Sequence, residues 1–155
     1  MRGVANMKLE NVTSHIIKNM TIWLWGGFIY YLIELAWRGH SHPSMFIVGG
    51  LCLIIVSGIN DKFPWDMPLA LQCFIGGIVI TLIELITGCI VNLWLGWGVW
   101  DYSSLPLNVL GQVSLPFILA WIGLALVCIY VDDYLRWKLY GEERPRYKWF
   151  SSDVE

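Results

Sequence analysis

Four long apolar runs divide this chain and leave most of its charges near the two ends. The runs cover about residues 20–38, 44–60, 68–94 and 112–133. A helix needs about 20 residues, or about 17 at the short end, to cross the hydrocarbon core of a bilayer. Because lipid cannot hydrogen-bond to the backbone, each run is expected to be a helix. The pattern predicts an all-α membrane protein with four transmembrane helices.

Composition supports this class and excludes others. Charged residues make up 14% of the 155 residues and hydrophobic ones 57%, whereas a soluble domain usually carries about 25% charged residues. The net charge of −2 gives no reason to expect a nucleic-acid partner. Four cysteines lie inside the apolar runs without a CxxC pair, which favours buried hydrophobic packing over disulfides or a metal site. These are Cys52, Cys73, Cys89 and Cys128.

The basic residues predict the orientation. With both ends of the chain in the cytoplasm, nine of the ten Lys and Arg residues lie on the inner side and only Arg38 lies outside, as the positive-inside rule requires. Residues 1–18 are then a cytoplasmic segment, either an interfacial amphipathic helix or a loose tail, and residues 19–134 form the membrane domain. The basic, aromatic tail 135–155 is expected to lie on anionic lipid headgroups rather than to bind RNA.

A short internal repeat relates the first and third apolar runs. Residues 26–35 and 76–85 are identical at six of ten positions, and both contain Gly-Gly and Ile-Glu-Leu. The offset predicts two parallel two-helix repeats, covering 20–60 and 68–133, about an axis normal to the membrane. The alternative is that small residues and acids recur in both segments for packing reasons alone.

Glu34 and Glu84 occupy equivalent places in this repeat. A charged side chain near the middle of a bilayer costs roughly 2.5–3.5 kcal/mol on insertion scales, so such residues usually face a bundle interior or an aqueous cavity. Each acid shares a helical face with small or polar residues at intervals of three and four. A function for this acid pair is the favoured interpretation. The alternative is a protonated Glu that makes an interhelical hydrogen bond.

Arg38 follows Glu34 by four residues, which is the favourable order for an ion pair on one helix. Because Glu84 has Gly88 at the equivalent position, Arg38 is predicted to serve both carboxylates. The alternative is that the long side chain of Arg38 extends to the outer lipid headgroups.

Residues 92–112 form the other region with dense polar and aromatic side chains. The segment is too polar and too rich in Gly and Pro to span a bilayer, so an interfacial or re-entrant cap over the bundle is predicted. The alternative is an aromatic belt with turn residues. His40 and His42 are expected to be turn residues rather than metal ligands. The candidate residues lining a cavity or substrate site are Glu34, Arg38, Glu84, Asn92, Trp100, Asp101, Tyr102, Asn108 and Gln112.

Four stretches resemble the CmpB-like family, which is labelled "putative ABC-transporter type IV". They are Ile-Glu-Leu-Ala-Trp-Arg at 33–38, the segment 42–50, Ile-Glu-Leu-Ile-Thr-Gly at 83–88 and the segment 100–112, in which Trp-Asp-Tyr-Ser is the most specific part. The resemblance covers about residues 22–133. It implies a permease-like membrane component, and because the chain has no Walker motif, ATP-driven transport would need a second protein.

Three functions remain open from the sequence. The first is a multi-pass component of a transport system that works as a homo-oligomer or with a partner ATPase. The second is an intramembrane lipid- or isoprenoid-modifying enzyme, with Glu34, Glu84 or Asp101 as a general acid. The third is a membrane assembly or structural factor. No cofactor is expected in any of them.

Overall fold

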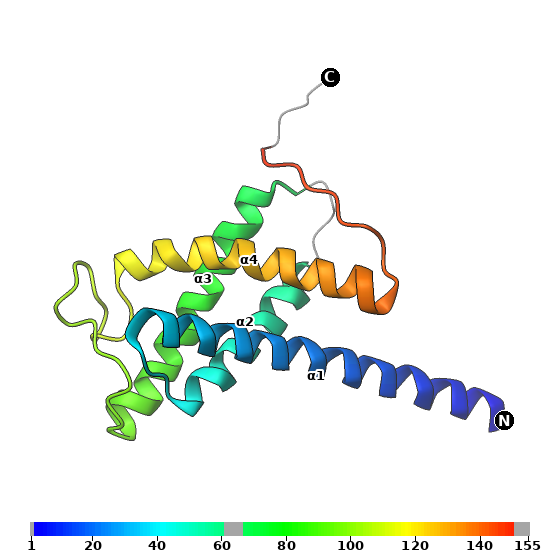
Figure 1. Ribbon diagram of the computed structural model, residues 1–155, viewed down its shortest axis with the longest axis horizontal. Helices are drawn as coiled ribbons and strands as arrows, with labels where there is room; N and C mark the ends of the chain where they lie inside the picture. The colour runs from blue at the N-terminus through cyan, green and yellow to red at the C-terminus, as the bar shows by residue number, and fades with distance from the viewer. Residues whose placement is uncertain (1, 61–66, 151–155) are drawn as a thin grey trace.

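A computed structural model describes residues 2–60 and 67–150, and Lys62 and the last five residues of the predicted tail lie outside this description. These residues form four α-helices, as the sequence predicts for an all-α protein (Figure 1). Within the described ranges the only β-type pairing is an isolated bridge between Val109 and Val113. The helices are α1 (Arg2–Arg38), α2 (Pro43–Asn60), α3 (Leu69–Gly88) and α4 (Leu115–Tyr140), and a π-helix, η1 (Cys89–Trp94), continues α3.

Two of these helices are long and apolar enough to cross a membrane. They are Leu69–Trp94, formed by α3 with η1, and α4, each 26 residues long and therefore about 39 Å in length at 1.5 Å per residue. Helix α2 contains a shorter apolar stretch, Pro43–Gly58. Helix α1 is continuous from Arg2, so the N-terminal segment and the first apolar run lie on one helix.

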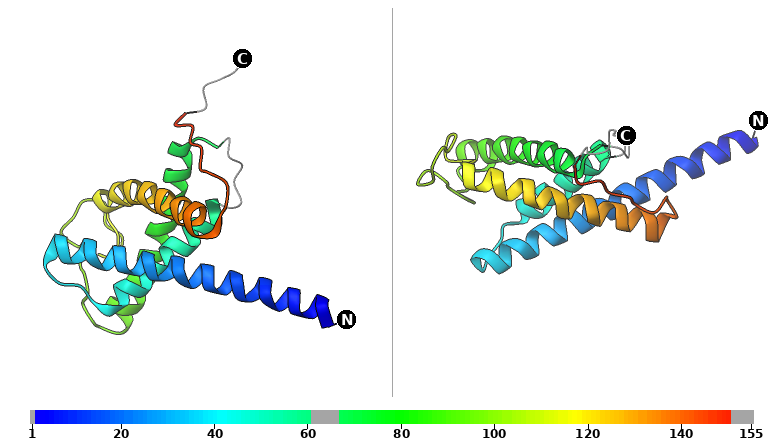
Figure 2. Two further views of the ribbon diagram at one scale, coloured as in Figure 1. Left: turned by 45° about the vertical axis from the view of Figure 1, so that its right-hand side comes forward. Right: turned by 90° about the horizontal axis from the view of Figure 1, so that it is seen from above.

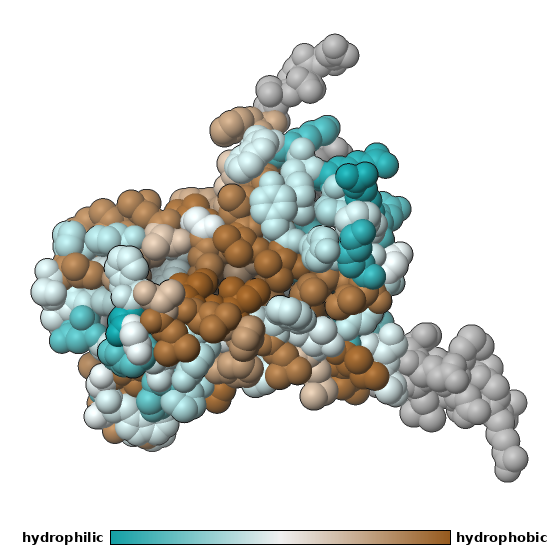
Figure 3. All heavy atoms as spheres, viewed as in Figure 1, coloured by the Kyte–Doolittle hydropathy of each residue, from teal (hydrophilic) through white to brown (hydrophobic). Residues whose placement is uncertain are grey.

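The outward-facing surface of the bundle is apolar. Large hydrophobic side chains are exposed along all four helices, and in Figure 3 they gather in a band between more hydrophilic ends. Exposed apolar surface of this extent is expected where lipid rather than water surrounds the protein. Examples on each helix are Trp25, Phe28, Ile47, Phe74, Ile86 and Leu119.

The helices pack as two pairs. Helix α1 packs mainly on α2, and α3 mainly on α4 (Figure 2). Glycines make both contacts close. A methyl group added at Gly26 would come within 2.7 Å of the carbonyl oxygen of Gly49, and one added at Gly77 would come within 2.7 Å of the Cα of Ile122. The Gly-Gly pairs of the two repeat segments therefore serve the same packing purpose in α1 and α3.

Residues 141–150, which follow α4, fold back along the bundle and reach the start of α3 (Figure 1). The first N–H groups of a helix have no partner within the helix, and Pro68 at the N-cap gives α3 no side-chain cap. The Leu69 N–H instead donates to the carbonyl oxygen of Lys148 at 2.7 Å. The Tyr147 hydroxyl donates to Asp133 on α4 at 2.7 Å. This segment therefore ties the start of α3 to the end of α4.

Candidate functional site

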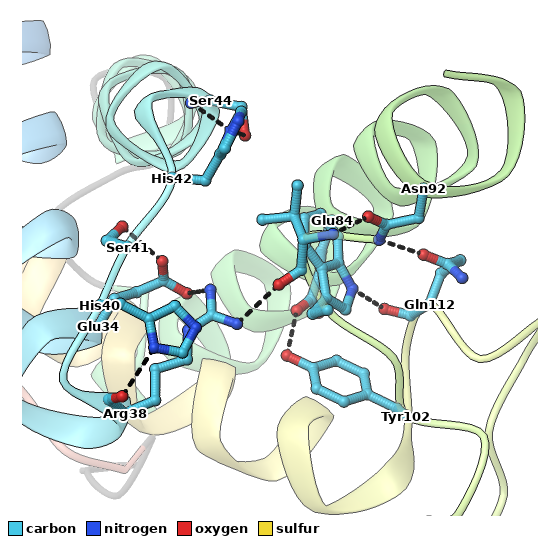
Figure 4. A network of polar contacts seen from close by, with 12 residues as sticks. Glu34, Arg38, His40, Ser41, His42, Ser44, Glu84, Asn92, Tyr102 and Gln112 are labelled. Carbon is cyan, nitrogen blue, oxygen red and sulfur yellow. Dashed lines mark hydrogen bonds and ion pairs between the residues drawn. The ribbon is translucent and has the colours of Figure 1, made fainter. Parts of the chain in front are cut away.

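Glu34 and Arg38 form an ion pair at the C-terminal end of α1, as their spacing predicts. Arg38 Nη2 lies 2.5 Å from Glu34 Oε1, and the Ser41 hydroxyl donates to the other carboxylate oxygen at 2.7 Å. Arg38 Nη1 donates to the carbonyl oxygen of Val99 at 2.9 Å (Figure 4). Since Val99 belongs to the segment between η1 and α4, Arg38 joins the two helix pairs.

Asn92 of η1 also holds the segment between η1 and α4 in place. Asn92 Oδ1 accepts from the Val99 N–H at 2.7 Å, and Asn92 Nδ2 donates to Gln112 Oε1 at 2.7 Å. The Trp100 indole N–H donates to the carbonyl oxygen of Gln112 at 2.9 Å. Short π-helical stretches often occur at functional sites, and here η1 ends the apolar helix Leu69–Trp94, with Asn92 hydrogen-bonded to the segment that follows it. Residues 95–114 are thus a packed cap rather than a loose loop.

Glu84 is the most enclosed acid of this region, with 3% of its surface exposed. Glu84 comes fifteen positions after Leu69, or about 22 Å along the helix, and Trp94 lies about 15 Å beyond it. The Tyr102 hydroxyl from the cap donates to Glu84 Oε1 at 3.1 Å. The Trp121 indole N–H on α4 donates to Oε2. Glu84 therefore lies far from both ends of its helix, and the side chains that hold it there are neutral.

The prediction that Arg38 serves both carboxylates is wrong. The guanidinium group contacts Glu34 and Val99, whereas Glu84 receives its hydrogen bonds from Tyr102 and Trp121. The reason is the path of the cap, which places a tyrosine hydroxyl next to Glu84 and a backbone carbonyl next to Arg38. The two acids therefore have different electrostatic surroundings despite their equivalent places in the sequence.

The remaining candidate residues divide between the cap interior and its surface. Burial, and then the charge of Glu84, raise the pKa of Tyr102 above its usual value. Asp101 is exposed, and its pKa is lowered because the hydroxyl and N–H of Ser103 donate to its carboxylate. Asn108 is also exposed and donates to the carbonyl oxygens of Ser103 and Leu105. Asp101 and Asn108 thus shape the turns of the cap, while Asn92, Trp100, Tyr102 and Gln112 connect it to the bundle.

A second polar cluster lies near the opposite end of the bundle and was not among the candidates. Asp132 is fully buried on α4 and accepts from Ser57 of α2 at 2.8 Å and from Arg136 at 2.9 Å. Its signal in the sequence is an acid and an arginine spaced by four residues. That signal was missed because Arg136 was assigned to the tail 135–155 on the lipid headgroups, apart from Asp132 in the apolar run 112–133.

Glu142 extends this second cluster toward α1. Its carboxylate contacts Lys18 of α1 and lies 3.6 Å from Arg136 Nη1. Burial by itself would raise the pKa of Glu142, but the hydrogen bond from Lys18 and the charges of Lys18 and Arg136 lower it overall. Charged groups thus link α1, α2 and α4 at the end of the molecule opposite the cap.

Removing Arg38, the cation that is paired with Glu34, is expected to destabilise the protein. Arg38→Ala leaves Glu34 with only the Ser41 hydroxyl among the contacts described above. The thermal unfolding midpoint of this variant in detergent should therefore fall. Glu34→Gln should partly restore the midpoint of Arg38→Ala, because it removes the unpaired charge. A double-mutant cycle should give a coupling of about 0.5–2 kcal/mol. Additive effects would show that the two side chains do not stabilise each other.

Comparison with known proteins identifies one family. The model of the family described as "Putative ABC-transporter type IV" matches residues 21–150. The match includes all four helices, except the N-terminal part of α1, and the cap between η1 and α4. No curated protein and no solved structure matches the chain.

Proposed function

Since the chain belongs to the "Putative ABC-transporter type IV" family, we propose that it is a permease-like, multi-pass membrane component of a transport system. The observation that carries this proposal is the position of Glu84. An acid that is 3% exposed and far from both ends of an apolar helix is costly to place in a membrane. Residues of this kind usually belong to a pathway for a substrate or an ion.

The proposal includes four membrane spans, with both ends of the chain in the cytoplasm. The apolar surfaces of α1 and α2 support two spans in addition to the two most hydrophobic helices. The equivalent packing of the Gly-Gly pairs supports an arrangement of two parallel repeats, α1 with α2 and α3 with α4. The cap then lies outside the cell and the cluster around Asp132 lies near the cytoplasm.

Labelling of single cysteines should reveal this orientation. In a variant without the four native cysteines, an impermeant maleimide added to intact cells should label Ser104→Cys in the cap. It should label Glu143→Cys, beyond α4, only after the membrane is opened. Both positions are exposed, so accessibility within the protein does not bias the comparison. Labelling of both cysteines from the same side would contradict a four-span protein.

The transport proposal requires an energy source outside this chain, and we expect a separate ATPase subunit. The native protein should be captured from its own membranes in a mild detergent, and the captured proteins should be identified by mass spectrometry. An unrelated multi-pass protein with the same tag is the control. The expected result is a nucleotide-binding subunit present only in the first sample, together with ATP hydrolysis. A protein that emerges alone, with neither an ATPase nor a second copy, would contradict the proposal.

A further inference from the structure

Glu84 receives hydrogen bonds from two neutral donors. The Tyr102 hydroxyl donates to Oε1 at 3.1 Å (Figure 4), and the Trp121 indole N–H donates to Oε2. The side chain is enclosed, with 3% of the residue exposed. A charge that is buried without an opposite charge is costly, and such a group usually becomes neutral by binding a proton. The groups around Glu84 therefore decide whether it is charged.

The titratable groups that interact with Glu84 are themselves acids. Tyr30 and Glu34 belong to α1, Cys52 belongs to α2, and Tyr102 belongs to the cap. Helix α4 contributes an indole, which does not titrate. In the part of the chain that the structure describes, neither a lysine nor an arginine contacts the Glu84 carboxylate. None of these surroundings supplies the positive charge that an ionised Glu84 would need.

The same surroundings limit which cation the carboxylate can bind. Both of its oxygens already receive a hydrogen bond, and the O–H and N–H edges of the two rings point toward it. The described residues contain no group of three or more His, Cys, Asp or Glu side chains that could hold a metal ion. A proton needs neither additional space nor further ligands. It is therefore the cation that fits this carboxylate.

We propose that Glu84 and Tyr102 form a proton-binding site, in which the proton lies on Glu84 Oε1 and the Tyr102 oxygen accepts its hydrogen bond. An indole N–H can only donate, so Trp121 keeps its role whether Glu84 is charged or neutral. A tyrosine hydroxyl can donate or accept, so Tyr102 can reverse its hydrogen bond when the proton binds. Because Tyr102 belongs to the cap, the proton changes a contact between the cap and the bundle. The site goes beyond the transport role and does not depend on it.

Replacement with glutamine distinguishes a bound proton from a charge. In Glu84→Gln the amide oxygen can accept from Trp121 and the amide nitrogen can donate to Tyr102. This is the hydrogen-bond pattern of the protonated acid, so the variant should fold. Glu34→Gln is the matched control. Glu34 occupies the equivalent position in the repeat segments, but its carboxylate is ionised in a pair with Arg38.

Infrared spectroscopy of the purified full chain in detergent tests the proposal. At about pH 7 an exposed glutamate, with an ordinary pKa of about 4.3, is ionised. The carbonyl band of a protonated carboxyl group should nevertheless be present in the parent and in Glu34→Gln, and it should be lost in Glu84→Gln. In Tyr102→Phe the band should shift to higher frequency, because the carboxyl group loses a hydrogen bond. If Glu84→Gln does not fold, carbon-13 in the glutamate carboxyl groups should lower the frequency of the band in Glu34→Gln, which assigns it to another glutamate.

The pH dependence of stability gives a second measurement. A folded chain that holds this proton binds more protons than the unfolded chain, so a rise in pH favours unfolding. The thermal midpoint of the parent, relative to that of Glu84→Gln, should therefore fall as the pH rises from about 5, until the folded chain also releases the proton. A carboxyl band that is the same in the parent and in Glu84→Gln would overturn the proton site. An unchanged frequency in Tyr102→Phe would overturn the role of Tyr102.

Discussion

Replacing Arg136 with methionine is expected to lower the free energy of unfolding by about 3–5 kcal/mol. Asp132 is fully buried, and its carboxylate lies 2.8 Å from Arg136 Nε in the closer of two contacts. Arg136 also donates to the Ser57 hydroxyl on α2 at 2.5 Å. Loss of the guanidinium removes this ion pair from a buried carboxylate and weakens the contact between α2 and α4. Titration with SDS in a mild detergent should measure the change.

Lys138→Met is the matched control for this change. Lys138 lies on the same last turns of α4, but it is exposed and rests over the ring of Trp137. Exposed charges usually contribute less than about 1 kcal/mol, so this variant should unfold close to the parent. Asp132→Asn combined with Arg136→Met should recover part of the loss. Equal stability of Arg136→Met and Lys138→Met would show that the buried pair does not stabilise the bundle.

A single methyl group at the α1–α2 crossing is expected to cost about 1–3 kcal/mol of stability. The Cβ of Gly49→Ala would lie 2.4 Å from the Cβ of Tyr30 and 2.8 Å from the carbonyl oxygen of Gly26. Neither atom is the free end of a flexible side chain, so the two helices must move apart. The same shift would displace Tyr30, which packs on Trp121. Thermal unfolding in detergent should therefore show a lower midpoint for Gly49→Ala than for the parent.

The same change from glycine to alanine is not expected to lower stability at Gly123. Gly123 lies inside α4, and no atom of the described structure lies within 4 Å of an added methyl group there. Alanine favours a helix over glycine by about 0.5–1 kcal/mol. This variant should be as stable as the parent or slightly more stable. A loss at Gly123 as large as that at Gly49 would show that close packing at the α1–α2 crossing is not the cause of the loss at Gly49.

The sequence predicts the helices well because apolar runs of this length are typical of helices. The run 68–94 corresponds closely to α3 with η1, and the spacing of Glu34 and Arg38 predicts their ion pair. Helix α4 extends to Tyr140, beyond the predicted end at 133. Its last turns remain helical because Asp132 and Arg136 satisfy each other within the bundle. Hydropathy alone cannot distinguish such a buried pair from charges at the headgroups.

The contacts of the cap depend on irregular backbone turns, which leave no periodic pattern in the sequence. Between η1 and α4 the backbone turns at Leu107 and Leu110 with positive φ angles of 50° and 55°, which non-glycine residues adopt uncommonly. These turns determine which side chains face the bundle. For this reason the sequence identifies Tyr102 as a candidate but does not show that its hydroxyl meets Glu84.

The pairing of residue 148 with the start of α3 has a consequence for how the protein is made. Lys148 comes about 80 residues after Leu69 in the chain, and a ribosome adds about 5–20 residues per second, so α3 waits about 4–16 s for this partner. During that interval water must satisfy the Leu69 N–H. In the proposed membrane arrangement, insertion of α3 and completion of its N-terminus are therefore separate events in biogenesis, and the second follows the synthesis of α4.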